Sequence, residues 1–199
     1  MISAILLAAG KSKRMKGENK LIKKINNIPL INYSIKNILA SSVDELIIVL
    51  GYENNAIENL IQKNSKIKII INKNFNEGMA SSIKLGLENL SSKSKSFFIC
   101  LADMPMVSQN IYNKMIKSKL NYNKKKNIKY KKEIIIPTYN GKDGNPVLFS
   151  SLMKNKFMQI NGDIGAKKII ETNPNLILSV PFNDNKIFLD FDTQEDFNF

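Results

Sequence analysis

The sequence contains no histidine, a single cysteine and a single arginine among its 199 residues. Without histidine, a His-based catalytic triad, a histidine-ligated metal and an imidazole general base are all excluded. The one cysteine, Cys100, rules out an internal disulfide and fits a reducing, cytoplasmic environment. Chemistry is therefore left to carboxylates, lysines and metal-bound water or phosphate.

Long apolar runs are also missing. The apolar N-terminal segment, residues 1–8, lacks a preceding basic region and ends after the length of one strand, so we expect neither a signal peptide nor a membrane span. A chain of 199 residues with 43% hydrophobic residues suits one globular domain with a real core.

Positive charge is abundant, with a net charge of +13, but it is scattered along the chain. The densest cluster, residues 123–132, has the composition of a solvated surface insert, and we assign it no role. No nucleic-acid-binding motif accompanies it, so we expect no nucleic-acid partner. A positive field also suits small polyanions such as nucleoside triphosphates.

Short β-rich runs alternate with helical stretches along the chain. This alternation predicts a three-layer α/β/α, Rossmann-like domain with a mostly parallel sheet. The predicted strands are residues 2–7, 45–50, 67–71, 96–101, 133–137, 147–149 and 176–180, and the predicted helices are residues 30–39, 55–62, 79–90, 108–120 and 165–171.

The only arginine, Arg14, lies in a glycine-containing loop directly after the first predicted strand. Its planar fork grips phosphate or carboxylate oxygens two at a time, as a lysine cannot. Ligands bind such sheets at the carboxyl ends of the strands, where the sequence also places Lys20 and Asp103. Residues 76–82 form a turn into a helix start, which we expect to offer free N–H groups to anions. These groups together predict a site for a triphosphate and a divalent metal.

Two common phosphate loops are absent. A P-loop requires glycine where this chain has Met15, and no G-x-G-x-x-G is present. The pattern Leu-Ala-Ala-Gly-x-Ser-x-Arg-Met with a lysine five residues later remains, and it is more specific than a lone glycine loop.

These segments resemble the molybdenum cofactor cytidylyltransferases, within the MobA-like NTP transferases. The resemblance covers nearly the whole chain and rests on LAAGKSKRM at 7–15, NKL at 19–21, GY at 51–52, NEGMASSIKLGL at 76–87, LADMP at 101–105, GKDGNPVLF at 141–149, GDIGAK at 162–167 and LDFDTQEDF at 189–197.

The resemblance implies transfer of CMP from CTP to the phosphate of molybdenum-bound molybdopterin, with Mg²⁺ as cofactor and release of pyrophosphate. It implies one domain, with a nucleotide-binding half at about residues 1–106 and an acceptor-binding half at about residues 107–199. Catalytic roles fall to Arg14, Lys20 and Asp103. The implied nucleotide-binding residues are Leu7, Ala8, Ala9, Gly10, Ser12, Arg14, Lys20, Glu77, Gly78, Ser81 and Ser82.

The implied metal ligands are Asp103 and Asp192. Asp190 is an alternative second ligand, because residues two apart in an extended segment share one face. The implied acceptor-binding residues are Asn145, Pro146, Gly162, Asp163, Gly165 and Lys167. Asn145 stands where the family usually has histidine, and Lys167 where arginine is common, so this sequence departs from the family pattern at two of the acceptor-binding positions.

The choice of base rests on Ala9. Relatives that use GTP typically carry glycine at this place, and the extra methyl group narrows the space in favour of the smaller pyrimidine. Three functions stay open: the cytidylyltransferase, a related enzyme that uses GTP or acts on a sugar or alditol phosphate, and a non-catalytic module that delivers finished cofactor. A molybdenum hydroxylase is the implied client of either a catalytic or a delivery role.

Overall fold

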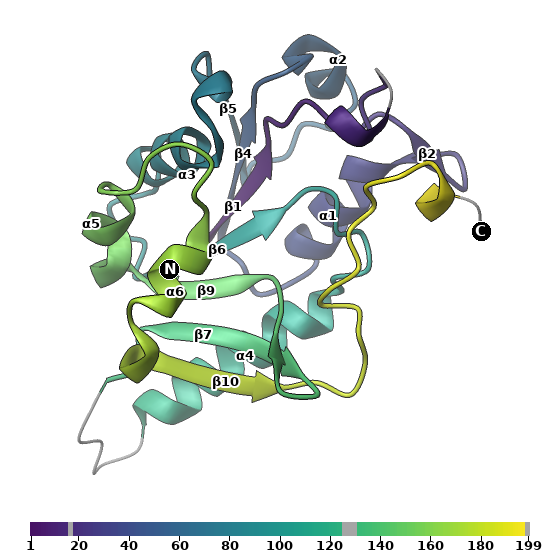
Figure 1. Ribbon diagram of the computed structural model, residues 1–199. Helices are drawn as coiled ribbons and strands as arrows, with labels where there is room; N and C mark the ends of the chain where they lie inside the picture. The colour runs from purple at the N-terminus through teal and green to yellow at the C-terminus, as the bar shows by residue number, and fades with distance from the viewer. Residues whose placement is uncertain (16–17, 125–130, 198–199) are drawn as a thin grey trace.

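The computed structural model describes residues 1–15, 18–124 and 131–197. Seven strands of its main sheet lie in the order β10-β7-β9-β6-β1-β4-β5, and an eighth, β8, pairs with β7 (Figure 1). The strands are β1 (Ile2–Ala8), β4 (Glu45–Leu50), β5 (Ile67–Ile71), β6 (Ser96–Leu101), β7 (Ile134–Tyr139), β8 (Lys142–Asp143), β9 (Val147–Ser150) and β10 (Ile177–Pro181), beside a small hairpin of β2 (Lys24–Ile25) and β3 (Ile28–Pro29).

Most neighbouring strands of the sheet run parallel. The central strand β1 is parallel to both β4 and β6, β4 is parallel to β5, and β7 is parallel to β10. One strand, β9, is antiparallel to β6 and β7 and joins the two parallel parts. The prediction of a mostly parallel α/β sheet is confirmed.

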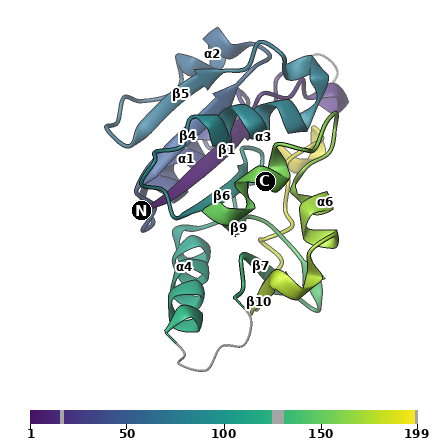
Figure 2. The same cartoon turned by 90° about the vertical axis from the view of Figure 1, so that its left-hand side faces the viewer.

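Helices cover both faces of the sheet (Figures 1 and 2). The helices are α1 (Leu30–Leu39), α2 (Asn54–Glu58), α3 (Met79–Glu88), α4 (Gln109–Asn123), α5 (Lys154–Phe157) and α6 (Ala166–Glu171). One apolar core forms where α1 and α4 pack on the sheet, and a second forms under α3, α5 and α6. The central strands are buried on both faces, which is why they are almost wholly apolar in sequence.

Several predicted elements have the observed bounds, both buried strands such as β4 and β6 and the edge strand β5. The bounds of α1, β4, β5 and β6 match the sequence prediction. The helix predicted over residues 55–62 is shorter, Asn54–Glu58, because Ile57 is its single buried side chain and little apolar surface holds further turns in place.

The C-terminal segment, residues 182–197, leaves β10 and crosses back to the carboxyl ends of the central strands (Figure 1). Three backbone hydrogen bonds join it to the rest of the described chain. Phe182 N–H donates to the Thr138 carbonyl at 2.7 Å, Asn145 N–H donates to the Ile187 carbonyl at 2.9 Å, and Phe191 N–H donates to the Asp103 carbonyl at 2.9 Å. This path brings Asp192 to the carboxyl end of β6, a strand that is distant from Asp192 in the sequence.

Among the helices in the described ranges, none has both the length and the apolar character needed to cross a membrane. The lysine-rich segment 123–132 lies largely outside the described residues.

Candidate active site

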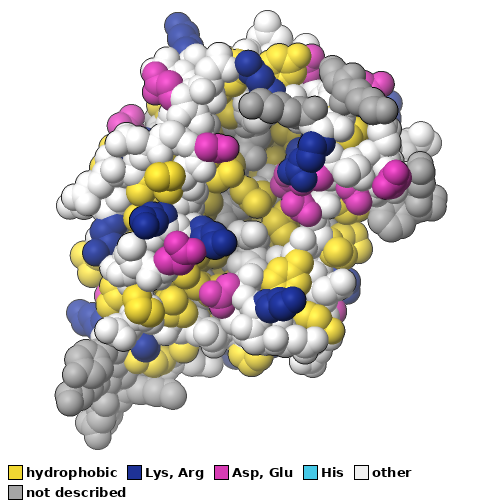
Figure 3. All heavy atoms as spheres, in the orientation of Figure 1, with side chains coloured by type: hydrophobic (Ala, Val, Ile, Leu, Met, Phe, Trp, Pro, Cys, Tyr) yellow, Lys and Arg dark blue, Asp and Glu magenta, His cyan; other side chains and the backbone are white. Residues whose placement is uncertain are grey.

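A cleft of about 600 Å³ opens at the carboxyl ends of β1 and β6, a size typical of small-molecule sites. Figure 3 shows this hollowed face, with acidic and basic side chains gathered beside the hollow. Thirteen lining residues were predicted from the sequence: Leu7, Ala8, Ala9, Gly10, Ser12, Arg14, Lys20, Glu77, Gly78, Ser82, Asp103, Asp163 and Asp192. Seven were not: Lys11, Leu21, Phe75, Asn76, Met79, Leu101 and Ala102.

The loop after β1 is folded by contacts within itself. Ser12 adopts a left-handed backbone conformation with φ 50°, and its hydroxyl accepts a hydrogen bond from the Lys20 backbone N–H at 3.2 Å. Met15 is fully buried and its N–H donates to the Ser12 carbonyl at 2.9 Å. The buried Met15 anchors the loop, while the side chain of Arg14 remains 72% exposed at the cleft.

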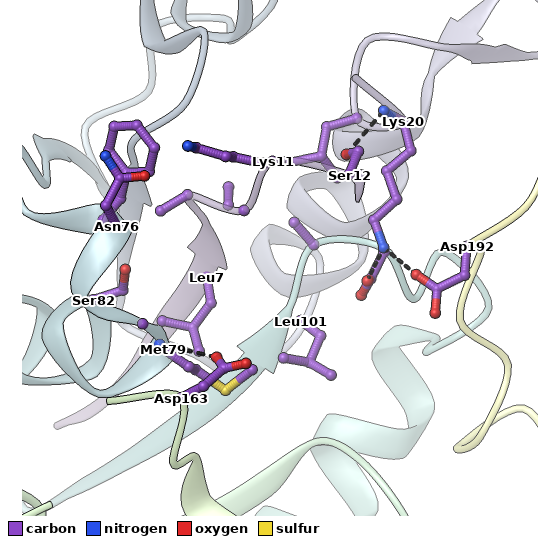
Figure 4. A pocket seen from close by; sticks show the side chains of 18 of the residues that line it. Leu7, Lys11, Ser12, Lys20, Asn76, Met79, Ser82, Leu101, Asp163 and Asp192 are labelled. Atoms are coloured by element: carbon purple, nitrogen blue, oxygen red, sulfur yellow. Dashed lines mark hydrogen bonds and ion pairs between the residues drawn. The ribbon is translucent and has the colours of Figure 1, made fainter. Parts of the chain in front are cut away.

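Lys20 joins two aspartates that are distant in sequence. Its Nζ lies 2.5 Å from Oδ2 of Asp103 and also donates to Oδ1 of Asp192 (Figure 4). The three side chains are only 13–19% exposed, so their charges are poorly screened by solvent. Burial alone would lower the pKa of Lys20, but the two carboxylates outweigh it and raise that pKa.

Asp192 also forms an ion pair with Arg14, whose Nη2 lies 2.5 Å from Oδ2 of Asp192. Burial would raise the pKa of Asp192, yet the hydrogen bond and charge of Lys20, together with the charge of Arg14, hold it below its ordinary value. Asp190 behaves in the opposite way, since burial and then the negative charges of Asp192 and Asp103 raise its pKa. Asp192 lines the cleft and Asp190 does not.

The two cleft aspartates fit a divalent metal that binds together with substrate phosphates. Oδ1 of Asp103 is buried and has no hydrogen-bond partner in the part of the chain that the structure describes, so one good oxygen ligand is unused. No group of three or more acidic, cysteine or histidine side chains is arranged for a metal among those same residues. Mg²⁺ is commonly held by one or two carboxylates, with phosphates and waters completing its shell.

The start of α3 differs from the prediction. Met79 N–H donates to Oδ1 of Asp163 at 3.3 Å, and Ala80 N–H donates to the Gly162 carbonyl at 3.1 Å. These two N–H groups were expected to be free for anions, but Gly162 and Asp163 already cap them, and Figure 4 shows the contact from Asp163 to Met79. Gly78, with φ 99° and ψ 179°, lets the two backbones approach, since an added Cβ would lie 2.3 Å from the Gly162 carbonyl carbon.

The two serines of α3 have different positions. The Ser81 hydroxyl donates to the carbonyls of Gly78 and Asn74, at 2.8 and 3.1 Å, and does not line the cleft. Ser82 lines the cleft and accepts a hydrogen bond from Asn72 at 2.9 Å. The nucleotide-binding role predicted for both therefore has geometric support only at Ser82.

The predicted acceptor-binding residues are mostly outside this cleft. Those that do not line it are Asn145, Pro146, Gly162, Gly165 and Lys167. The Lys167 side chain is 88% exposed and lies 4.0 Å from Glu171, one helical turn away in α6. Asp163 alone of this set faces the cleft, at the wall opposite Asp192 (Figure 4). The acceptor role of the others stays a prediction.

Lys11, Phe75 and Asn76 are the main residues that the sequence analysis missed. Phe75 and Asn76 follow β5, and the rule that ligands lie at the carboxyl ends of parallel strands could have included them. The segment singled out in the sequence, residues 76–82, begins at Asn76 because the turn into α3 begins there. The sequence prediction assigned no role to Phe75, the aromatic residue before it.

Solved structures share this fold across the whole chain. The protein Rv0371c of Mycobacterium tuberculosis H37Rv matches with a TM-score of 0.82 and 19% identity, over 98% of this chain and 94% of that one. A crystal structure of the same protein in complex with manganese matches with a TM-score of 0.78 and 18% identity, over 98% and 95%. A nucleotidyl transferase from Methanothermobacter matches with a TM-score of 0.80 and 17% identity, over 99% and 94%. The architecture is that of an α/β nucleotidyltransferase.

The sequence shows the family. The chain belongs to the MobA-like NTP transferase domain family, because the sequence model of that family matches residues 4–176. It is also similar to the molybdenum cofactor cytidylyltransferase of Escherichia coli K12, with 26% identity over 98% of this chain and 93% of that protein.

Proposed function

We propose that this protein is a Mg²⁺-dependent cytidylyltransferase that transfers CMP from CTP to the phosphate of molybdenum-bound molybdopterin. The observation that carries the proposal is Lys20, held between Asp103 and Asp192 in the cleft beside an unused Asp103 oxygen. Similarity to the Escherichia coli cytidylyltransferase over 98% of the chain supports this choice of substrates within the family.

The reaction needs no nucleophile from the protein. An oxygen of the acceptor phosphate attacks the α-phosphorus of CTP, the bond from that phosphorus to the bridging oxygen breaks, and pyrophosphate leaves with the electron pair. Catalysis then consists of positioning and charge neutralisation, which suits a chain without histidine.

Two cations of the cleft have distinct tasks. Arg14, with a 72% exposed side chain, is free enough to turn from Asp192 and grip the leaving β- and γ-phosphates with its fork. Lys20, buried at the ends of β1 and β6, neutralises the charge that grows on the α-phosphate. The backbone of residues 8–10 and the side chain of Ser12 hold the nucleotide in place between them.

Asp103 and Asp192 would hold the Mg²⁺ ion. When bound, the ion neutralises the phosphate charges and favours departure of pyrophosphate. Asp192 is the better partner than Asp190, since it faces the cleft and its pKa is held low.

CTP is favoured over GTP by Ala9, whose side chain is almost fully buried at the cleft wall. The methyl group takes room that a second glycine would leave open to a larger base. The nucleotide occupies the half formed by residues 1–106, and the acceptor approaches from residues 107–199, with Asp163 at the boundary. A molybdenum hydroxylase would receive the product.

The test is pyrophosphate release with CTP, GTP, ATP and UTP in the presence of Mg²⁺ and molybdenum-bound molybdopterin. We expect release with CTP alone and at least a 100-fold loss in Asp103→Asn, as for removal of a key electrostatic group. Asp184→Asn, a change at a half-exposed surface carboxylate, is the matched control and should retain full activity. Preference for GTP, or full activity in Asp103→Asn, would overturn the proposal.

A further inference from the structure

The end of the cleft away from Lys20 contains an aromatic ring that the proposed mechanism does not use. Phe75 lines the cleft from the short helical turn Phe75–Glu77, directly after β5, and its side chain is half-buried. An aromatic side chain at the wall of a ligand-sized cleft, instead of in the core, can stack on a planar partner.

The Phe75 ring is held in place because the segments that follow β1, β4 and β5 pack tightly together. Tyr52 packs against it with ring centroids 6.4 Å apart and an interplanar angle of 59°. Gly51 allows this approach, because an added Cβ would lie 2.8 Å from Cβ of both Phe75 and Ala9. Tyr52 N–H donates to the Ala9 carbonyl at 3.2 Å, which ties the loops after β1 and β4 together. Phe75 is therefore pre-positioned beside the residue that narrows the base site.

One face of the ring lies beneath an exposed side chain that also lines the cleft. The ammonium of Lys11, an exposed side chain that also lines the cleft, lies over the Phe75 ring at 5.6 Å from its centroid. The electron-rich face of a phenyl ring attracts a cation or a nucleobase. Because Lys11 is exposed and flexible, a base can displace it without breaking buried contacts.

The polarity of the cleft determines which part of a nucleotide meets this ring. Lys20 and Asp192 lie on one side, and Asn76 and Ser82 lie on the opposite side (Figure 4). A triphosphate anchored at the charged side leaves its ribose and base to extend toward the other. That end offers a ring face from Phe75 and an amide from Asn76, which can both donate and accept hydrogen bonds.

We propose that Phe75 is the stacking platform for the nucleobase and therefore a positioning and specificity residue for the nucleotide. The inference rests on the proposed function only in taking the substrate to be a nucleoside triphosphate. It assigns the base to the Phe75 face in place of the Lys11 ammonium, with Tyr52 and Gly51 holding the ring in place.

The absence of tryptophan from the chain makes a direct test possible. Phe75→Trp introduces a single indole, whose fluorescence is quenched when a base stacks on it. We expect CTP to quench this emission in a saturable way, whereas inorganic tripolyphosphate, which has no base, leaves it unchanged. Tyr52→Trp places the indole behind the platform and should respond little to CTP.

A second pair of variants measures the energetic role of the ring. Phe75→Leu keeps apolar volume but removes the face, so its Kd and KM for CTP should rise about tenfold, with kcat and the Kd for tripolyphosphate unchanged. The control is Phe182→Leu, since Phe182 is also a part-exposed ring beneath a lysine, with Lys114 at 4.3 Å, but lies outside the cleft. That control should bind CTP as the unaltered protein does.

Equal quenching by CTP and tripolyphosphate, or unchanged CTP affinity in Phe75→Leu, would overturn the platform. Quenching by the molybdopterin acceptor and not by CTP would overturn it as well, by assigning the ring to the acceptor. If GTP quenches and CTP does not, the platform stands and the proposed choice of nucleotide fails. If CTP supports transfer with equal KM in Phe75→Leu, the proposed function stands and the platform fails.

Discussion

The ammonium of Lys20 lies 2.5 Å from Oδ2 of Asp103, whereas Oδ1 of the same carboxylate is buried with no hydrogen-bond partner among the described residues. Together with Asp192, this carboxylate encloses the ammonium as it would enclose a metal ion. If a metal binds these two carboxylates as proposed, Lys20 would compete with it for Oδ2 of Asp103 and Oδ1 of Asp192 until a phosphate offers the ammonium a new partner.

This competition predicts the metal affinity of the nucleotide-free protein. Lys20→Met should bind Mn²⁺ about tenfold more tightly than the unaltered protein, because a charge-assisted contact with each aspartate no longer has to be broken. Calorimetry or electron paramagnetic resonance of Mn²⁺ would measure the difference. Lys24→Met, at an exposed lysine of β2, is the control and should change nothing. Equal Mn²⁺ affinity in the unaltered protein and Lys20→Met would contradict the account.

The two tail aspartates should differ sharply when each is replaced. Asp192→Asn removes the partner of Lys20 and Arg14 and should lower kcat/KM about 100-fold or more. Asp190→Asn should lower it less than about tenfold, because Asp190 does not line the cleft. Steady-state kinetics of both variants would decide, and a larger loss in Asp190→Asn would reverse the metal assignment.

The close contact of Gly162 and Asp163 with the start of α3 depends on Gly78. Gly78→Ala should destabilise the fold by about 3 kcal/mol or more, since its backbone conformation is accessible almost only to glycine and its methyl group would meet the Gly162 carbonyl. Gly141 also has a positive φ, of 74°, but open space around it, so Gly141→Ala should cost only about 1 kcal/mol. Urea unfolding of the two variants isolates the steric contribution, and equal losses would show that the α3 contact is unimportant.

The buried Lys119 of α4 should make stability depend on pH. Its Nζ donates to the Ser96 hydroxyl at 2.5 Å, and burial, opposed by the charge of Glu133, lowers its pKa to about 8 from the ordinary 10.5. Between these values the unfolded chain binds the proton and the native chain does not. The free energy of unfolding contributed by this group therefore rises as the pH increases from about 8 to 10.5, and it is lowest below pH 8.

Variants of Lys119 and of a neighbouring exposed lysine separate the titration of Lys119 from that of other groups that titrate in the same pH range. Lys119→Met should be more stable than the unaltered protein at pH 7, and this advantage should shrink by up to about 3 kcal/mol by pH 10.5. Lys117→Met, at an exposed position of the same helix, should follow the unaltered protein at every pH. An advantage of Lys119→Met that stays constant with pH would rule out the lowered pKa.

The sequence predicted best the strands whose apolar runs are buried. The bounds of β4 and β6 follow from continuous apolar runs, and they agree with the structure. The reversal of β9 and the two-residue strands β2, β3 and β8 were not predicted, because short segments carry no periodicity and strand direction depends on tertiary pairing.

In the site, the residue types were predictable but their partnerships were not. Asp103 and Asp192 were both proposed as metal ligands, yet spacing could not distinguish Asp192 from Asp190. The path of residues 182–197 brings Asp192, and not Asp190, into the lining of the cleft, and this path depends on long-range contacts such as Phe191 N–H to the Asp103 carbonyl. Asp163 was expected at the acceptor, and the hydrogen bond that it accepts from Met79 N–H joins it to the start of α3.

The most direct test of the central claim follows the α-phosphate itself. The protein would be incubated with Mg²⁺, molybdenum-bound molybdopterin and CTP labelled at the α-phosphorus, and the label in the acceptor would be compared with the pyrophosphate released. The account predicts one labelled CMP unit on the acceptor for each pyrophosphate, and no labelled acceptor when GTP replaces CTP. Label transferred from GTP, or from CTP only to a sugar or alditol phosphate, would contradict it.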